Sequence, residues 1–168
     1  DDALVAALVD SPKDAAEHRI VVDAVVDALA HWCTEVGVSS LRDVVKLASV
    51  SHLTTTVRGA LVQPAPSSLD LVGALHPTPA VGGWPTAPAL DLIEGLEGFD
   101  RGLYAGPVGW TNAEGDGEWA VALRCAALDG ARAHLYTGAG LVAGSEPGAE
   151  WRETQAKLEP MLQALLRP

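Results

Sequence analysis

Residues 104–139, YAGPVGWTNAEGDGEWAVALRCAALDGARAHLYTGA, decide the class of fold that the chain can adopt. Three apolar segments in this stretch predict strands: 104–111, 118–128 and 131–139. The connections between them, NAEGDG at 112–117 and Asp-Gly at 129–130, are typical of tight hairpin turns, so the strands should be antiparallel. Helical patterns come before and after this group of strands. Strands and helices that occur in separate runs predict an α+β fold, with antiparallel sheets flanked by helices.

The sequence on either side of this stretch supplies the other elements. Residues 11–36 predict one long helix, because Ser11-Pro12 forms a typical helix start and apolar residues then recur at three- and four-residue steps, with Gly37 as the end. The remaining pattern predicts strands at 44–49 and 51–61, helices at 67–75, 87–96 and 150–166, and an irregular proline-rich loop at 76–85.

Composition excludes several classes of partner. The 168 residues fit one domain, about half of them are apolar, which predicts a hydrophobic core, and no apolar run approaches the roughly 18 residues of a membrane span. A net charge of −11 with only three lysines argues against nucleic acid and anionic membranes as partners. The N-terminus does not resemble a signal peptide, and we expect it to be a cut inside a longer protein.

The two cysteines do not indicate a metal site. Cys33 and Cys125 lie far apart, with no Cys-X-X-Cys motif and no histidine cluster near them, so a zinc site is not expected. We interpret both as buried structural thiols in a reducing, cytoplasmic compartment.

The C-terminal helix and the turn before it hold the residues best suited to chemistry. Glu150, Glu153 and Lys157 have i, i+3 and i+7 spacing, so they share one helix face, and Gly138-Ala139-Gly140 is a turn whose backbone amides can approach an anion. Two carboxylates can hold Mg²⁺, while the lysine and the amides can hold a carboxylate. The alternative is a solvated helix face with a Glu153–Lys157 ion pair.

Four other polar residues have two possible roles each. Arg124 is predicted on a strand between Leu123 and Cys125, where its charge must either form a structural ion pair or bind an anion. The alternatives to a site role are a satisfied core histidine for His52, a loop-stabilising hydrogen bond for His76, and core packing for Tyr136.

Seven segments, taken in order, resemble one enzyme family. They are KDAAEH at 13–18, the strand from His52 to Gly59, LHPTPA at 75–80, YAGPVGW at 104–110, GEW at 117–119 with RCA at 124–126, GAG at 138–140, and 150–157. Together they resemble the C-terminal part of a chorismate-utilising enzyme, most closely an isochorismate synthase. The resemblance implies the anthranilate-synthase-like chorismate-binding fold, with residues 1–168 as the C-terminal portion of a single domain.

The resemblance also implies a role for each matching position. Glu17 and Glu153 would be Mg²⁺ ligands, with Glu150 joining the same cluster through water or through contacts with the ligating groups. Ala80 would line the chorismate ring, with His52 close by. A further group would receive the enolpyruvyl carboxylate of chorismate: Arg124, Tyr136, Gly138, Gly140 and Lys157.

The implied activity is the Mg²⁺-dependent conversion of chorismate to isochorismate, for siderophore or menaquinone synthesis. The His-Pro-Thr-Pro-Ala sequence ending at Ala80 resembles the water-adding branch of the family rather than the branches that have threonine at that position. The lysine base and glutamate acid of the family belong to an N-terminal portion not included in these residues, and Lys13 and Lys46 lie in the wrong context to replace the base. We therefore expect a complementary N-terminal segment as a partner. A salicylate synthase and a non-catalytic fragment are the alternatives.

Overall fold

The structure is a computed structural model that describes residues 2–39, 43–46 and 51–166. Its helices are α1 (Asp2–Asp10), α2 (Pro12–Leu29), α3 (Ser68–Leu75), α4 (Pro79–Gly82), α5 (Thr86–Leu96) and α6 (Pro147–Leu166). Its strands are β1 (Cys33–Val38), β2 (Asp43–Lys46), β3 (Ser51–Thr54), β4 (Val57–Leu61), β5 (Pro107–Thr111), β6 (Gly117–Val121), β7 (Cys125–Asp129) and β8 (Arg132–Tyr136). Helices and strands occur in separate runs, so the α+β prediction is confirmed.

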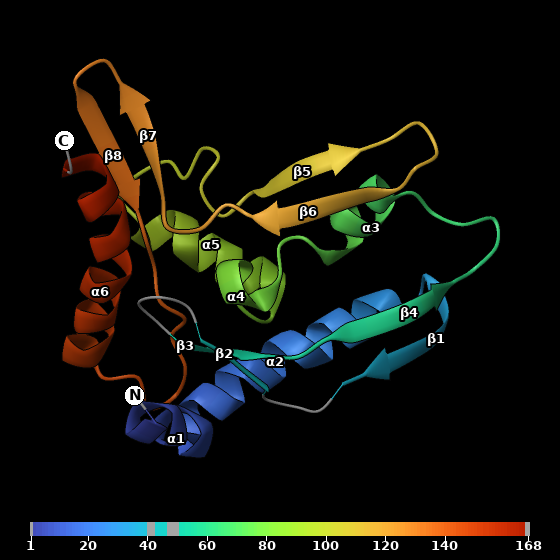
Figure 1. The fold of residues 1–168 in the computed structure, drawn as a ribbon, viewed down its shortest axis with the longest axis horizontal. Coiled ribbons are helices and arrows are strands. Elements are labelled where there is room, and N and C mark those ends of the chain that lie inside the picture. The colour runs from blue at the N-terminus through green and yellow to red at the C-terminus, as the bar shows by residue number, and fades with distance from the viewer. Residues whose placement is uncertain (1, 40–42, 47–50, 167–168) are drawn as a thin grey trace.

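The described strands form four separate antiparallel pairs: β1–β4, β2–β3, β5–β6 and β7–β8. Helix α2 contacts α3, α4 and β4, while α3 also contacts the β5–β6 pair, so the short helices lie between two layers (Figure 1). Helix α6 contacts β8 at the other end of the molecule. The antiparallel sheets flanked by helices are therefore confirmed.

Several predicted boundaries are wrong, and for the strands and the end of α2 the reason is that long-range pairing overrides the local pattern. The helix predicted to end at Gly37 ends at Leu29, and Cys33–Val38 instead pairs with β4. The strand predicted at 51–61 is two strands that pair with different partners, and the strand predicted at 118–128 is also two, β6 and β7. Four residues of the predicted irregular loop form α4. Residues 47–49 of the strand predicted at 44–49 lie outside the described residues.

Serine caps fix the starts of two helices. The Ser11 side chain accepts a hydrogen bond from the Asp14 amide at 3.2 Å. Ser67 and Asp70 form a reciprocal capping box at the start of α3: the Ser67 hydroxyl accepts from the Asp70 amide at 3.2 Å, and the Asp70 carboxylate accepts from the Ser67 amide at 2.9 Å. These bonds satisfy amides that have no partner inside the helix, so both predicted helix starts have a local cause.

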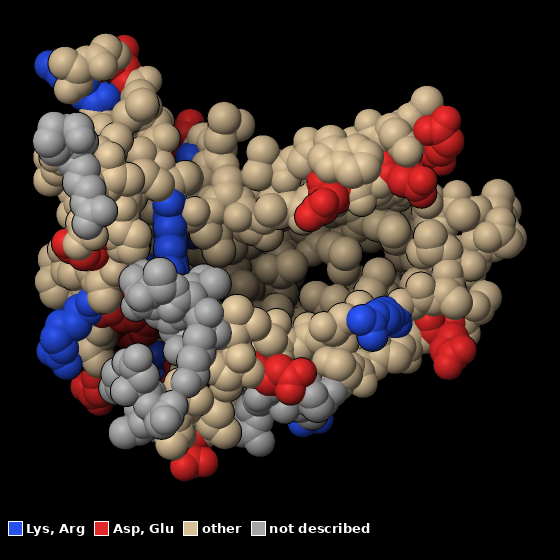
Figure 2. Space-filling model, in the orientation of Figure 1, with Lys and Arg blue, Asp and Glu red and all other residues tan. Residues whose placement is uncertain are grey.

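The described elements bury little apolar surface. Val22 and Ala105 are the buried hydrophobic residues among those the structure describes, while Trp84, Trp110 and Trp151 are more than half exposed, so the hydrophobic core expected from composition is not formed by these elements. Figure 2 shows a hollow on this face between the β5–β6 pair and the α2–β4 layer, and the atoms lining it belong mainly to residues other than Lys, Arg, Asp and Glu. None of the described helices is long and apolar enough to cross a membrane.

Candidate functional site

Two helices from opposite ends of the chain bring Glu17 and Glu150 to the same ammonium group. Lys13 and Glu17 lie four residues apart on α2, and Glu150 lies in the first turn of α6. The Lys13 Nζ atom is 3.1 Å from Glu17 Oε1 and 2.8 Å from Glu150 Oε1. The two carboxylates raise the pKa of Lys13, and the Lys13 ammonium lowers the pKa of Glu150 below its usual range. Lys13 and Glu150 are therefore both charged at neutral pH.

The Glu150 carboxylate is withdrawn from solvent. Glu150 is only 7% exposed, and both of its side-chain oxygens are buried, as is Oε1 of Glu17. Lys13 is the cation that both carboxylates contact, and Ser145 also bonds to Glu150. Buried carboxylate oxygens gathered around one cation are suited to a metal, and Mg²⁺ commonly uses one or two carboxylates together with water and substrate oxygens.

The three predicted metal ligands do not converge on one point. Among the residues that the structure describes, no three His, Cys, Asp or Glu side chains are close enough together to hold a metal ion. Glu153 lies one turn after Glu150 and pairs with Lys157, whose Nζ is 2.6 Å from Glu153 Oε1. The residues present thus fit a cation held between Glu17 and Glu150, with Glu153 beside that pair.

Lys157 connects the acidic group to the glycine turn. Its Nζ donates a hydrogen bond to the Gly138 carbonyl oxygen at 3.2 Å while pairing with Glu153. A Cβ atom at Gly140 would lie 3.4 Å from Glu17 Oε2, and one at Gly138 would lie 2.8 Å from the Tyr104 hydroxyl oxygen. A side chain at Gly138 would therefore crowd the Tyr104 hydroxyl, whereas a Cβ at Gly140 would only make an ordinary van der Waals contact with the Glu17 carboxylate. The Glu153–Lys157 ion pair, which the sequence offered as an alternative to a binding role, is formed next to the glycine turn.

Arg124 lies at the bend between β6 and β7, which corrects its predicted position inside a strand. Its backbone has a φ of 48°, in the left-handed region that non-glycine residues seldom adopt. Its Nη2 atom is 3.1 Å from Nε2 of His52 on β3. Burial, together with the charges of Arg124 and Lys157, lowers the pKa of His52. A neutral His52 can accept a hydrogen bond from Arg124, so the pair orients the guanidinium without adding positive charge.

An aromatic group lies behind the glycine turn. The rings of Tyr136 and Tyr104 stack with centroids 5.4 Å apart, and Phe99 lies 5.9 Å from Tyr136. The Arg101 guanidinium lies 5.7 Å from the Tyr104 ring and forms two hydrogen bonds to Glu97, at 2.6 and 2.7 Å. Burial raises the pKa of Tyr104. Tyr136 therefore packs within an aromatic stack and lies two residues before Gly138, which is consistent with either role expected for it.

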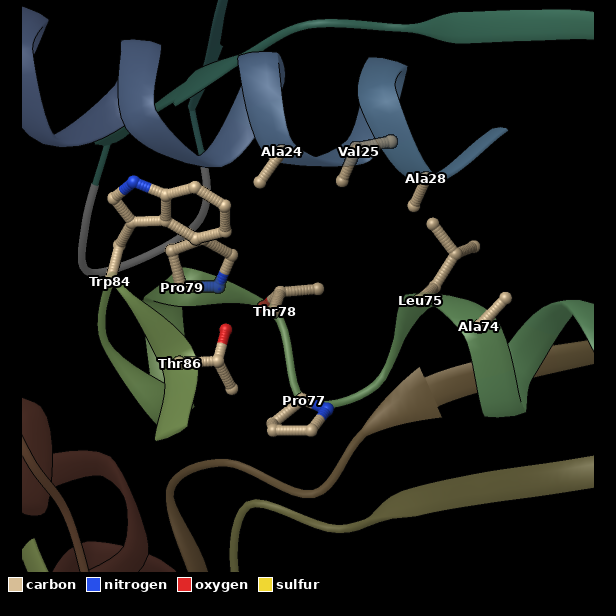
Figure 3. A pocket seen from close by; sticks show the side chains of 10 residues that line it. All are labelled: Ala24, Val25, Ala28, Ala74, Leu75, Pro77, Thr78, Pro79, Trp84 and Thr86. Carbon is tan, nitrogen blue, oxygen red and sulfur yellow. The ribbon is translucent and has the colours of Figure 1, made fainter. Parts of the chain in front are cut away.

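Ala80 does not take part in the contacts that connect the other predicted site residues. It is an exposed residue of α4, next to a cavity of about 120 Å³. Figure 3 shows the cavity between alanine and valine side chains of α2 and the 74–86 segment, where Trp84 and Pro79 face α2. Its lining contains no charged side chain and none of the predicted site residues. We interpret it as a packing gap rather than as the site of chemistry.

Sequence reasoning missed two residues of this group and misplaced the cysteines. From the sequence, Lys13 was considered only as a possible catalytic base. Its i,i+4 spacing to Glu17 could have indicated the ion pair that the structure shows. Nothing in the sequence indicates that the Tyr104 hydroxyl lies against Gly138. Cys33 and Cys125 are free thiols, as expected, but both are partly exposed rather than buried.

The chain is similar to proteins of known family. The sequence model of the family described as "Chorismate binding enzyme" matches residues 1–166. The isochorismate synthase DhbC of Bacillus subtilis is 44% identical over 165 residues, which are 98% of this chain and 42% of that protein. The crystal structure of DhbC from Bacillus anthracis superimposes with a TM-score of 0.94 at 45% identity, covering 98% of this chain and 44% of that one.

A second solved structure extends the likeness to another branch. Anthranilate synthase component I from Streptococcus pneumoniae has a TM-score of 0.85 at 35% identity, covering 95% of this chain and 37% of that one. The chain thus spans less than half the length of these relatives. The match over nearly all of its residues, and the acidic pair near Lys157 and the glycine turn, lead to one conclusion: this chain belongs to the family of chorismate-binding enzymes.

Proposed function

We propose that the protein containing this chain converts chorismate to isochorismate with the aid of Mg²⁺. The observation that best supports this is the position of Lys157, whose ammonium contacts both Glu153 of the acidic group and the carbonyl oxygen of Gly138 in the glycine turn. Acidic and basic groups so close together suit a small dicarboxylate bound partly through a metal. The name of the B. subtilis relative supports the choice of reaction.

Glu17, Glu150 and Glu153 are the residues that would hold the metal. The buried carboxylate oxygens of Glu17 and Glu150, which contact the same Lys13 ammonium, support this assignment. When bound, Mg²⁺ would neutralise the ring carboxylate of chorismate and fix the ring. Without the metal, the negative charge of these glutamates would repel the ring carboxylate of chorismate.

The second carboxylate of chorismate, on the enolpyruvyl side chain, would be bound by the basic group. Arg124 would offer a planar pair of N–H donors, with neutral His52 limiting its rotation. Lys157 and the backbone amides of Gly138 and Gly140 would complete the binding, and the Tyr136 hydroxyl would add a donor. These residues would bind and orient the substrate.

The reaction adds water at ring C2 while the C4 hydroxyl leaves and the double bonds shift. It needs a base for the water and an acid for the leaving hydroxyl. We place both in polypeptide outside these 168 residues, a lysine as base and a glutamate as acid. Two observations support a further segment: relatives extend well beyond the matched region, and large apolar side chains such as Leu96, Leu103 and Trp110 are exposed. Exposed apolar surface of this kind favours association.

The released product and the pathway that uses it are part of the same proposal. The absence of threonine at Ala80 supports isochorismate as the released product, and the isochorismate would feed siderophore or menaquinone synthesis. The two free cysteines support a reducing, cytoplasmic location.

The test uses the complete natural polypeptide that contains these residues. Purified protein is incubated with chorismate and Mg²⁺, and isochorismate is measured by chromatography, with pyruvate measured in parallel by a lactate dehydrogenase assay. We expect isochorismate with little pyruvate, and loss of turnover with EDTA. Stoichiometric pyruvate would instead identify a salicylate synthase, and the absence of any product would favour a binding role.

A further inference from the structure

Lys13 is the group that joins the Glu17 and Glu150 carboxylates. Its Nζ contacts Glu150 of α6 and Glu17 of α2, at 2.8 and 3.1 Å, and its side chain is 30% exposed. Lys157, which pairs with Glu153, adds a second positive charge that acts on Glu150. Lys13 is thus the cation that directly contacts both carboxylates, three of whose oxygens are buried.

We propose that Lys13 is an internal counter-cation that competes with the metal for Glu17 and Glu150. Without metal, its ammonium holds the two carboxylates together; when metal binds, the ammonium must leave them, so Lys13 sets the metal concentration that the enzyme requires. This inference rests on the proposed function, because it needs the Glu17–Glu150 pair to be the metal site. Lys13 is then a positioning residue, and it is not a base.

The physical reason lies in the charges. An ammonium and a divalent cation repel each other and cannot share the same carboxylate oxygens, so metal binding includes the cost of breaking both Lys13 ion pairs. The long, flexible lysine side chain and its partial exposure allow it to move into water. Removing the ammonium eliminates this cost and leaves the two carboxylates uncompensated, so metal affinity should rise. A lysine that only fastened α2 to α6 would have the opposite effect or none, because its loss would loosen the site.

The experiment compares three variants in the complete natural polypeptide, without chorismate. Lys13→Met removes the charge, Lys13→Arg keeps it, and Arg19→Met removes the same charge from an exposed ion pair with Asp23 on the same helix. Mn²⁺ affinity is measured from the free-ion signal in electron paramagnetic resonance, and Mg²⁺ affinity by competition. We expect Lys13→Met to bind metal about tenfold more tightly, from the Coulomb energy of nearby charges in a water-like dielectric. We expect Lys13→Arg and Arg19→Met to stay near the wild type.

Thermal unfolding gives a second measurement. Lys13→Met should melt at a lower temperature than the wild type without metal, and should gain more from saturating Mg²⁺, because only the metal then balances the two carboxylates. If Lys13→Met does not fold without metal, Lys13→Gln takes its place in both measurements.

The results separate this inference from the proposed function. Metal affinity that is unchanged or weaker in Lys13→Met, or equal tightening in Arg19→Met, would overturn the role of Lys13, as would a wild-type protein that binds no metal. The proposed function is judged separately by the product formed from chorismate: tighter metal binding in Lys13→Met would stand even if that product were not isochorismate.

Discussion

Replacing Arg124 by alanine and by glycine separates the work of its side chain from the strain of its backbone. The guanidinium lies 3.1 Å from His52 and is proposed to bind a carboxylate of chorismate. Both replacements remove it and leave that carboxylate with one fewer charged partner. Losing one partner of a buried charge pair costs about 2–5 kcal/mol of binding free energy. We expect the lower end, about 2–3 kcal/mol, because Arg124 is partly exposed and Lys157 is proposed to bind the same carboxylate. That loss corresponds to a roughly 30- to 150-fold weaker chorismate affinity.

The two variants should differ in stability but not in binding. The φ of 48° at Arg124 is unfavourable for alanine and open to glycine. The glycine variant should therefore be about 1 kcal/mol more stable than the alanine variant, the cost of a Cβ atom in the left-handed region. At a position with ordinary extended backbone, glycine would instead be the less stable of the two.

The assay measures chorismate binding by isothermal titration calorimetry and the free energy of unfolding by urea denaturation, both on the complete polypeptide. Arg132→Ala, at an exposed position of β8, is the control for loss of one positive charge. Wild-type chorismate affinity in both Arg124 variants would refute the carboxylate role. An alanine variant at least as stable as the glycine variant would refute the backbone argument.

Three further predictions concern the cap, the metal and pH. Ser67→Ala should lower the free energy of unfolding by about 1 kcal/mol, because the Asp70 amide loses its acceptor, whereas Ser67→Thr should lose little; urea denaturation would measure both, and equal losses would contradict the capping box. Glu17→Gln should raise the Mg²⁺ concentration for half-maximal turnover at least tenfold, since a charged ligand is lost, with circular dichroism unchanged; turnover at wild-type Mg²⁺ concentrations would remove Glu17 from the metal site. Because the pKa of His52 is lowered in the folded protein, the unfolded chain binds more protons between about pH 6.5 and the folded-state pKa, so the free energy of unfolding should decrease as the pH is lowered through that window. His52→Gln should reduce this pH dependence, and an unchanged slope of stability against pH would contradict the neutral histidine.

What could be predicted locally was predicted well. The hairpin turns at 112–117 and at Gly130 and the cap at Ser67 are set by residues close in sequence, so the β5–β6 and β7–β8 pairs and the start of α3 follow from the local pattern. The face shared by Glu150, Glu153 and Lys157 follows from helical spacing alone, as the 2.6 Å Glu153–Lys157 pair confirms. The ordered motifs were also enough to indicate the family.

The tertiary structure decided what depends on residues far apart in the chain. The break at Arg124 arises where β6 ends its pairing with β5 and β7 begins its pairing with β8, and no residue type near Arg124 signals a positive φ. The contact between Arg124 and His52 spans 72 positions. Lys13 meets Glu150 only because α2 and α6, from opposite ends of the chain, bring their first turns together. Local spacing predicts which residues share an element, whereas the partner of a charge is fixed by packing between elements, where burial makes an unpaired charge costly.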